Sequence, residues 1–211
     1  MANDSRNRMV ASAAALIGSR GVSATSFSDV LAESGAPRGS IYHHFPDGKV
    51  QLAQDAVRWT SARVLAHQAA YEGVTARGVL ERFVALWRCV VLSSDGAAGC
   101  VVAGVAIDTT ARDVALVDVV REAFRAWADL LSSQLEASGV GSARGRAIAT
   151  ATLAGVEGAL ILCRAEGGVG PLDTVAEGLY ALLPAETVAG PPAKTKAKSS
   201  KKHKTKAHRD R

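Results

Sequence analysis

The sequence predicts an all-α protein, with a small head of short helices at its N-terminus and a larger helical bundle after it. Apolar residues recur at helical spacing along most of the chain, and Gly, Pro and Ser clusters interrupt them where helices would end. No segment has the pattern of a convincing strand. About nine helices are expected.

Composition excludes several classes of protein. The chain has 211 residues, of which 48% are hydrophobic, so it can bury a core and is not disordered throughout. It has no apolar run of about 18 residues, as a membrane span needs, and the N-terminus lacks a signal-peptide pattern. We therefore expect a cytoplasmic protein that does not enter the membrane. Its cysteines, Cys89, Cys100 and Cys163, are too far apart for a disulfide framework or a metal site, and are expected to be small buried residues. Neither a metal nor a cofactor is expected.

The basic character of the chain belongs to its C-terminal tail. Residues 184–211 hold seven lysines and two arginines against Glu186 and Asp210, whereas the net charge of the whole chain is only +5. The preceding residues therefore carry a small net negative charge. The tail has too little apolar content to order itself, so it is expected to be disordered. It serves either as a solubility appendage or as a source of sequence-independent affinity for DNA through counterion release.

The head should begin with an amphipathic helix over residues 5–20, which ends at Gly21. Its inward face is expected to consist of Val10, Ala13, Leu16 and Ile17.

Two further short helices are expected within residues 26–49. Ser26 and Asp29 have the spacing of a capping box, and Gly35 suits the left-handed position that ends a helix. Pro37 fits the first turn of a helix, so a second short helix should start near it and run to His44. Two short helices joined by a glycine-containing turn form a helix-turn-helix.

This segment resembles the TetR family of bacterial transcriptional regulators. The matching positions are Gly35, Gly39, Tyr42, Phe45 and Lys49, and the run APRGSIYHHFPDGK is similar to the LmrA/YxaF-like branch. The short segment GCVVAGVAIDTT, residues 99–110, also resembles that branch. One residue departs from the pattern, because the family usually has a serine where this chain has Pro37. The cap of the second helix must therefore come from elsewhere or be missing.

The resemblance implies a sequence-specific DNA-binding regulator, most readily a repressor that a small apolar ligand releases from a palindromic operator. The residues expected to contact double-stranded DNA are Arg38, Gly39, Ser40, Tyr42, His43, His44 and Lys49. Arg38 and His43 are expected to reach bases, and Tyr42, His44 and Lys49 the backbone. By the same resemblance, Arg6 and Arg8 are candidate phosphate contacts, with plain solvated charges as the alternative.

The rest of the chain should form the bundle. A long helix from Asp47 to about Tyr71 would connect the head to it. The stripe along this helix is Leu52, Ala56, Trp59, Arg63 and Ala66. The further helices are expected over residues 75–92, 113–137, 147–165 and 171–183, with the short apolar segment 99–110 between the first two.

Several apolar residues of the bundle are candidates for a ligand cavity. The set implied by the resemblance is Phe83, Trp87, Cys100, Val105, Ala106, Phe124 and Trp127. Aromatic residues at helical spacing also form ordinary core, and that alternative stays open. The polar groups available to such a cavity are Arg88, Asp108, Thr109 and Glu157.

The last two helices are candidates for a homodimer interface. The family forms its two-fold interface there, and the helix over residues 147–165 is rich in Ala and Gly, which lets helix axes approach closely. The candidate residues are Leu153, Leu160, Leu172, Leu179 and Leu182. Packing within one chain is the alternative.

These observations divide the chain into a DNA-binding domain at residues 1–46, a regulatory and dimerisation domain at 47–183 and the tail. Enzyme motifs are missing, since we find no G-x-S-x-G, P-loop, dinucleotide fingerprint or metal-spaced His/Glu set. His43 and His44 are adjacent on a helix and point about 100° apart, which suits no catalytic pair. A nucleoid-type architectural protein that coats DNA through the tail is the alternative function.

Overall fold

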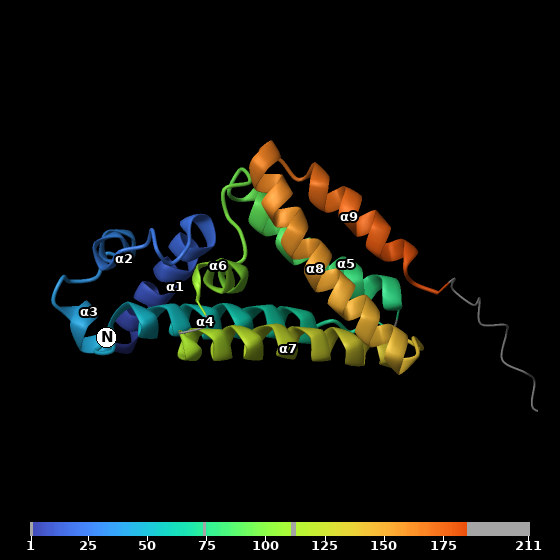
Figure 1. Ribbon diagram of the computed structural model, residues 1–211, viewed down its shortest axis with the longest axis horizontal. Helices are drawn as coiled ribbons and strands as arrows, with labels where there is room; N and C mark the ends of the chain where they lie inside the picture. The colour runs from blue at the N-terminus through green and yellow to red at the C-terminus, as the bar shows by residue number, and fades with distance from the viewer. Residues whose placement is uncertain (1, 74, 111–112, 185–211) are drawn as a thin grey trace, which may run out of the picture.

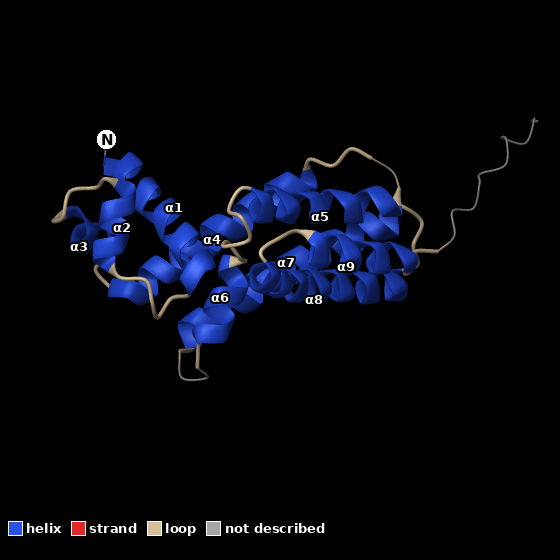
Figure 2. Ribbon diagram, turned by 90° about the horizontal axis from the view of Figure 1, so that it is seen from above, coloured by secondary structure: helices blue, strands red, loops and turns tan. Residues whose placement is uncertain are grey.

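The fold is all-helical, as the sequence predicts. The computed structural model describes residues 2–73, 75–110 and 113–184, and within these ranges it has nine helices and no strand. Figure 1 shows a small head at one end, a bundle at the other and α4 running from one to the other. Figure 2 confirms the separation of head and bundle from above. The predicted disordered tail lies outside the described residues.

The head consists of α1 (Ala2–Arg20), α2 (Phe27–Ser34) and α3 (Ser40–His44). The predicted capping box is present, because the Ser26 hydroxyl accepts from the Asp29 backbone N–H while the Asp29 carboxylate accepts from that of Ser26. Hydrogen bonds donated to the Asp29 carboxylate by the Ser26 hydroxyl and by the Ser26 backbone N–H lower the pKa of Asp29, with the Arg20 charge adding to them. Gly35 has the predicted left-handed conformation, with φ 63°.

The second short helix starts later than predicted. We expected it near Pro37, but residues 38 and 39 form a turn closed by a 2.9 Å hydrogen bond from the Ser40 N–H to the Pro37 carbonyl. No side chain caps the helix, since Gly39 stands at the N-cap. The cap that Pro37 put in doubt is therefore missing. The helix is left with five residues.

Helix α4 (Gly48–Ala69) is the connecting rod, but its predicted stripe has two different parts. Leu52 and Ala56 are buried in the core. Trp59, Arg63 and Ala66 instead line a pocket beside the helix. The face of α4 that is buried against the bundle lies next to the predicted stripe around the helix. It carries Val57, Ser61, Val64 and Gln68.

The bundle contains α5 (Ala76–Leu92), α6 (Val101–Asp108), α7 (Val114–Ala137), α8 (Ser142–Glu166) and α9 (Gly170–Ala181). Figure 1 shows α7 lying along α4 and α8 crossing between α7 and α9. Helix α8 begins at Ser142 rather than near residue 147, because the turn before it needs only residues 138–141. Cys100 and Cys163 are buried as predicted, whereas the prediction for Cys89 is wrong because it lies on an exposed face of α5.

Polar side chains join α4 to α7 inside the core. Trp127 donates from its indole nitrogen to the Ser61 hydroxyl at 3.2 Å. Gln68, only 1% exposed, donates to the Gln134 side chain at 2.8 Å, and Gln134 donates back to the Gln68 carbonyl at 2.9 Å. Buried polar groups are costly unless paired, so these bonds fix one register of α4 against α7.

Helix α1 meets the start of α6 backbone to backbone. The Gly99 N–H donates to the Gly18 carbonyl at 2.9 Å, and a Cβ atom added at Gly18 would lie 2.8 Å from the Gly99 oxygen. Close by, a Cβ at Gly104 would lie 3.2 Å from the Ile17 carbonyl oxygen. Only glycine allows this approach of the head to the bundle.

The carboxyl group of Glu157 is half-buried in the bundle. Loss of water around Glu157 in α8 raises its pKa to about 7, although a hydrogen bond from the Cys100 thiol opposes this rise. Burial, and then the nearby Glu157 charge, raises the pKa of Cys100 well above its ordinary value. The thiolate is the reactive form of cysteine, so Cys100 is expected to be unreactive at neutral pH.

Helix α8 has the length and hydropathy that a membrane span also needs, and 44% of its most apolar window is buried in this fold. Its contacts with α7 and α9 bury part of this apolar surface in the core.

Gly18→Ala should lower the free energy of unfolding by about 1–2 kcal/mol. Overpacking costs about 1–3 kcal/mol, and the better helix propensity of alanine returns up to about 1 kcal/mol. Denaturant unfolding measures this change, with the same dependence of the unfolding free energy on denaturant concentration fitted to both proteins. Gly178→Ala in α9 is the matched control, since no atom lies within 4 Å of its added Cβ, and it should be neutral or stabilising. A Gly18→Ala protein as stable as its parent would contradict the tight contact.

Glu157→Gln should stabilise the protein at pH values above 7 and have little effect near pH 4.5. Between these values the folded protein holds a proton that the unfolded chain has lost, so the parent loses stability as the pH rises. Glutamine has no charge to bury, and the gain at about pH 8 should be about 2 kcal/mol after allowing for partial exposure. Unfolding measured across this range tests it, with exposed Glu166→Gln in α8 as control. A pH-independent difference would show that Glu157 titrates normally.

Candidate functional site

The exposed end of the head carries most of the predicted DNA-contacting residues. Arg38, Gly39 and His43 are exposed, and Ser40 and His44 are half-buried. Tyr42 is 69% exposed, and its ring packs edge-on against Phe27 with the ring centroids 5.7 Å apart. That contact orients the tyrosine and leaves most of its surface in solvent. Phe45 is 1% exposed and forms the aromatic centre of the head.

Lys49 lies beside this surface but already has a partner. Its ammonium group donates to the Ser23 carbonyl at 3.1 Å, which ties the first turn of α4 to the loop after α1. An ammonium group has three donor hydrogens, so a second acceptor can share it.

The two arginines of α1 differ in their surroundings. Arg6 forms a 2.6 Å ion pair with Asp55, whose side chain is only 14% exposed, and its guanidinium lies 5.6 Å from the centre of the Phe45 ring. Arg6 therefore joins α1 to α4, which favours a structural role over the phosphate contact considered above. Arg8 is exposed and lies 3.8 Å from Asp4.

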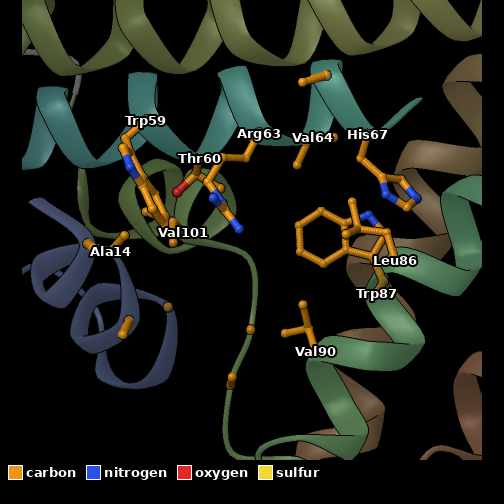
Figure 3. A pocket seen from close by; sticks show the side chains of 16 residues that line it. Ala14, Trp59, Thr60, Arg63, Val64, His67, Leu86, Trp87, Val90 and Val101 are labelled. Carbon is orange, nitrogen blue, oxygen red and sulfur yellow. The ribbon is translucent and has the colours of Figure 1, made fainter. Parts of the chain in front are cut away.

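A pocket lies where the head meets the bundle (Figure 3), and its volume is about 510 Å³. Small residues of α1 form one wall, namely Ala11, Ala14, Ala15 and Gly18. Trp59, Thr60, Arg63, Val64, Ala66 and His67 of α4 form a second wall, and Leu86, Trp87 and Val90 of α5 form a third. Ala98, Gly99 and Val101 complete the lining.

Of the seven residues predicted to line a cavity, only Trp87 lines this pocket. The four aromatic residues instead pack on one another, with ring centroids 5.6–6.5 Å apart, so they fill the space that a cavity would need. Cys100 and Val105 are buried, and Ala106 faces outward from α6. The structure thus favours the core alternative for this set.

The predicted polar partners are also engaged elsewhere. Arg88 pairs with Asp173 of α9. Asp108 accepts a 2.9 Å hydrogen bond from the Ser23 N–H, and Thr109 donates to the Val105 carbonyl. Arg63 and His67 were missed as pocket residues, because the stripe of Trp59, Arg63 and Ala66 shows a shared face of the helix but not the distant α1 and α5 residues that complete the cavity. Within the described ranges, no cluster of three or more His, Cys, Asp or Glu side chains could hold a metal ion.

The predicted interface leucines lie mostly inside the monomer. Leu153, Leu160, Leu172 and Leu179 are 9% exposed or less, and only Leu182, at 43%, faces solvent. Their burial agrees with the alternative that these leucines pack within one chain. The exposed residues of α8 include five small ones and two large apolar ones: Ala143, Ala147, Ala154, Gly158 and Ala165, with Ile161 and Leu162. Ile161 and Leu162 are 61% and 49% exposed, so an apolar stripe remains uncovered in the monomer.

The chain resembles known regulators along most of its length. Residues 10–56 match "Bacterial regulatory proteins, tetR family" and residues 76–178 match "Transcriptional regulator LmrA/YxaF-like, C-terminal domain". It is 39% identical over 186 residues to an uncharacterized HTH-type transcriptional regulator of Mycobacterium tuberculosis, covering 86% of this chain and 95% of that protein. It is 30% identical over 162 residues to the HTH-type transcriptional regulator LmrA of Bacillus subtilis, covering 75% of this chain and 86% of that protein.

Solved structures agree in fold. A TetR transcriptional regulator from Legionella pneumophila superposes with a TM-score of 0.75 at 23% identity, over 84% of this chain and 96% of that one. One from Chloroflexus aurantiacus superposes with a TM-score of 0.68 at 26% identity, over 85% of this chain and 94% of that one.

Proposed function

Since this chain belongs to the TetR family of bacterial transcriptional regulators, with a C-terminal domain of the LmrA/YxaF-like type, we propose that it is a dimeric repressor released from a palindromic operator by a small molecule. It is a DNA-binding regulator and not an enzyme. As a soluble regulator, it works in the cytoplasm. The observation that carries the proposal is the exposed surface of α3, which presents hydrogen-bond donors without an acidic residue among them.

The DNA contacts proposed for the head follow from exposure and chemistry. Arg38 and His43 are exposed donors on the turn and on α3, and can reach base edges in the major groove. Tyr42, held edge-on by Phe27, can place its hydroxyl on a phosphate. His44 and Lys49 are the other proposed backbone contacts, while Gly39 and Ser40 are small enough to let the groove wall approach.

A homodimer is proposed through the exposed face of α8. Its uncovered stripe includes Ala143, Ala147, Ala154 and Gly158, and small side chains allow two copies of α8 to pack closely. A two-fold axis would place each stripe against its copy, as an isologous interface requires. Exposed Leu182, at the C-cap of α9, is proposed to extend this interface.

This proposal keeps the division into a DNA-binding head at 1–46 and a regulatory domain at 47–183, with α4 shared between them. The lysines of the tail are proposed to add affinity for any DNA sequence. A nucleoid-type coating protein remains the second candidate function, and it depends on the tail alone. A repressor keeps a preferred site in excess non-specific DNA, whereas a coating protein does not.

Arg38→Ala should reduce affinity for the preferred operator about tenfold or more and leave affinity for random DNA nearly unchanged, because a base contact is worth about 1–3 kcal/mol of discrimination. The operator is first selected from genomic fragments bound by the full chain. Lys49→Ala is the contrasting variant, and should weaken both DNAs alike and lower the salt slope by about one. Equal loss on both DNAs for Arg38→Ala would make it a backbone contact. The absence of any preferred fragment would favour the coating function.

Ala154→Glu should shift the dimer to monomer at micromolar concentration, with a dissociation constant raised at least about tenfold, since two carboxylates would be brought out of water near the two-fold axis. Sedimentation analysis measures the effect. Ala69→Glu, an exposed change at the end of α4, is the matched control and should leave the dimer intact. A dimeric Ala154→Glu protein would place the interface elsewhere.

A further inference from the structure

The pocket at the junction of head and bundle has a distinct chemistry. Most of its lining is apolar, and none of its 16 lining residues is acidic. Arg63 and His67 are the lining residues that carry or can carry positive charge. The volume of about 510 Å³ falls within the range of small-molecule sites, about 300–1,000 Å³.

Arg63 is positioned without a counter-ion. Its guanidinium stacks over the Trp59 ring, 4.7 Å from the centroid, and it has no ion pair or hydrogen bond with another residue in the described part of the chain. Figure 3 shows the guanidinium extending from α4 into the space between Trp59 and Trp87. Stacking on an indole restricts the arginine to few conformers, so its donors are held ready for an acceptor.

Other polar atoms around the pocket are also unsatisfied. The Thr60 hydroxyl and the Trp87 indole nitrogen are buried and have no hydrogen-bond partner among the described residues. Thr60 is three residues before Arg63 and therefore lies on the same face of α4. The imidazole of His67, one turn after Arg63, makes one long 3.4 Å contact with the Arg82 carbonyl among the described residues, while the His67 backbone carbonyl accepts from Arg82 Nε at 2.7 Å. The Thr60 and Trp87 atoms have almost no exposed surface, so a ligand in the pocket meets the donors of exposed Arg63 rather than these two atoms.

We propose that this pocket binds a small organic anion: an apolar body bearing one carboxylate or sulfonate group. The anionic group pairs with Arg63, whose planar fork suits a bidentate contact. The apolar body lies between Trp59 and Trp87, against Leu86, Val90 and the small residues of α1. A cationic ligand is disfavoured by Arg63, because no acidic residue of the lining offsets its charge. This inference gives the chemical class of the small molecule in the proposed function. It rests on that function only where it concerns the release of DNA by the ligand.

Two fluorescent probes with the same aromatic body test the ligand class. The anion 8-anilinonaphthalene-1-sulfonate should bind the full chain, and Arg63→Gln should weaken it about tenfold or more, equivalent to about 1.4 kcal/mol. The neutral N-phenyl-1-naphthylamine, which lacks the sulfonate, should bind the variant and the parent nearly alike. Arg125→Gln, an exposed arginine of α7 outside the pocket, removes the same net charge and should change neither probe.

A second pair of variants tests the location. Ala66→Trp fills the pocket from an exposed position on α4 and should abolish binding of both probes, whereas Ala69→Trp, on the same helix but outside the pocket, should not. Thermal unfolding of each variant confirms that it is folded. Three results would each overturn the proposal. Arg63→Gln could lose affinity for both probes equally, or keep its full affinity for the sulfonate. Ala66→Trp could bind both probes as the parent does.

The effect on DNA is measured separately. Probe binding without DNA decides the ligand class, and operator affinity with and without the sulfonate decides whether occupancy releases DNA. A sulfonate that binds through Arg63 but leaves operator affinity unchanged would support the anion site and contradict the ligand-released repressor. Release of DNA by the sulfonate in the parent, but not in Arg63→Gln, would support both.

Discussion

The backbone contact between Gly18 and Gly99 is the constraint on which the placement of the head depends. A side chain at Gly18 would occupy the space that the carbonyl oxygen of Gly99 holds, 2.8 Å from its Cβ position. The contact brings the C-terminal end of α1 onto the segment that leads into α6. Two further contacts follow from it, because Gly104 can then approach the Ile17 carbonyl and Asp108 can accept from the Ser23 N–H. The head is therefore joined to the bundle twice, through the unbroken helix α4 and through α6, and cannot turn about α4 alone.

The same contact closes one side of the pocket. Gly18 and Gly99 both line it, and the small residues of α1 form a wall that faces Trp87 and Val90 of α5 across the cavity. A molecule in this space would touch the head and the bundle at once. A ligand shifts a conformational equilibrium only through different affinities for the two states. A site shared between two units offers such a difference directly, because any movement of α1 relative to α5 changes the shape of the cavity.

The head was predictable from sequence because its signals are local. The Ser26–Asp29 capping box and the turn at Gly35 depend on residues within a few positions of one another, and both are present. The bundle was predictable as a set of helices but not as a set of contacts. Helical spacing shows which residues share a face, and cannot show which neighbour covers that face. Leu153 and Leu160 were thus assigned to an interface, although both are buried within the monomer, where α8 contacts α7, α9 and α5. Trp59 and Arg63 lay on the predicted stripe, but the opposing wall of α1 comes from a distant part of the chain. No spacing within α4 could indicate a cavity there.

Because α4 is long, a small tilt near the pocket produces a displacement at the head that is large enough to affect DNA recognition. The helix has 22 residues and is therefore about 33 Å long. A tilt of about 5° over that length displaces its far end by about 3 Å. In a two-fold dimer both heads move, so the separation of the two α3 helices can change by about twice that amount, against a half-site spacing of about 34 Å. Hydrogen bonds to base edges are lost over about 1 Å. A rearrangement at Trp59 and Arg63, about half and about three-quarters of the way along α4 from its DNA-facing end, can therefore abolish recognition without unfolding any helix, provided that the α1–α6 contact transmits it to the head.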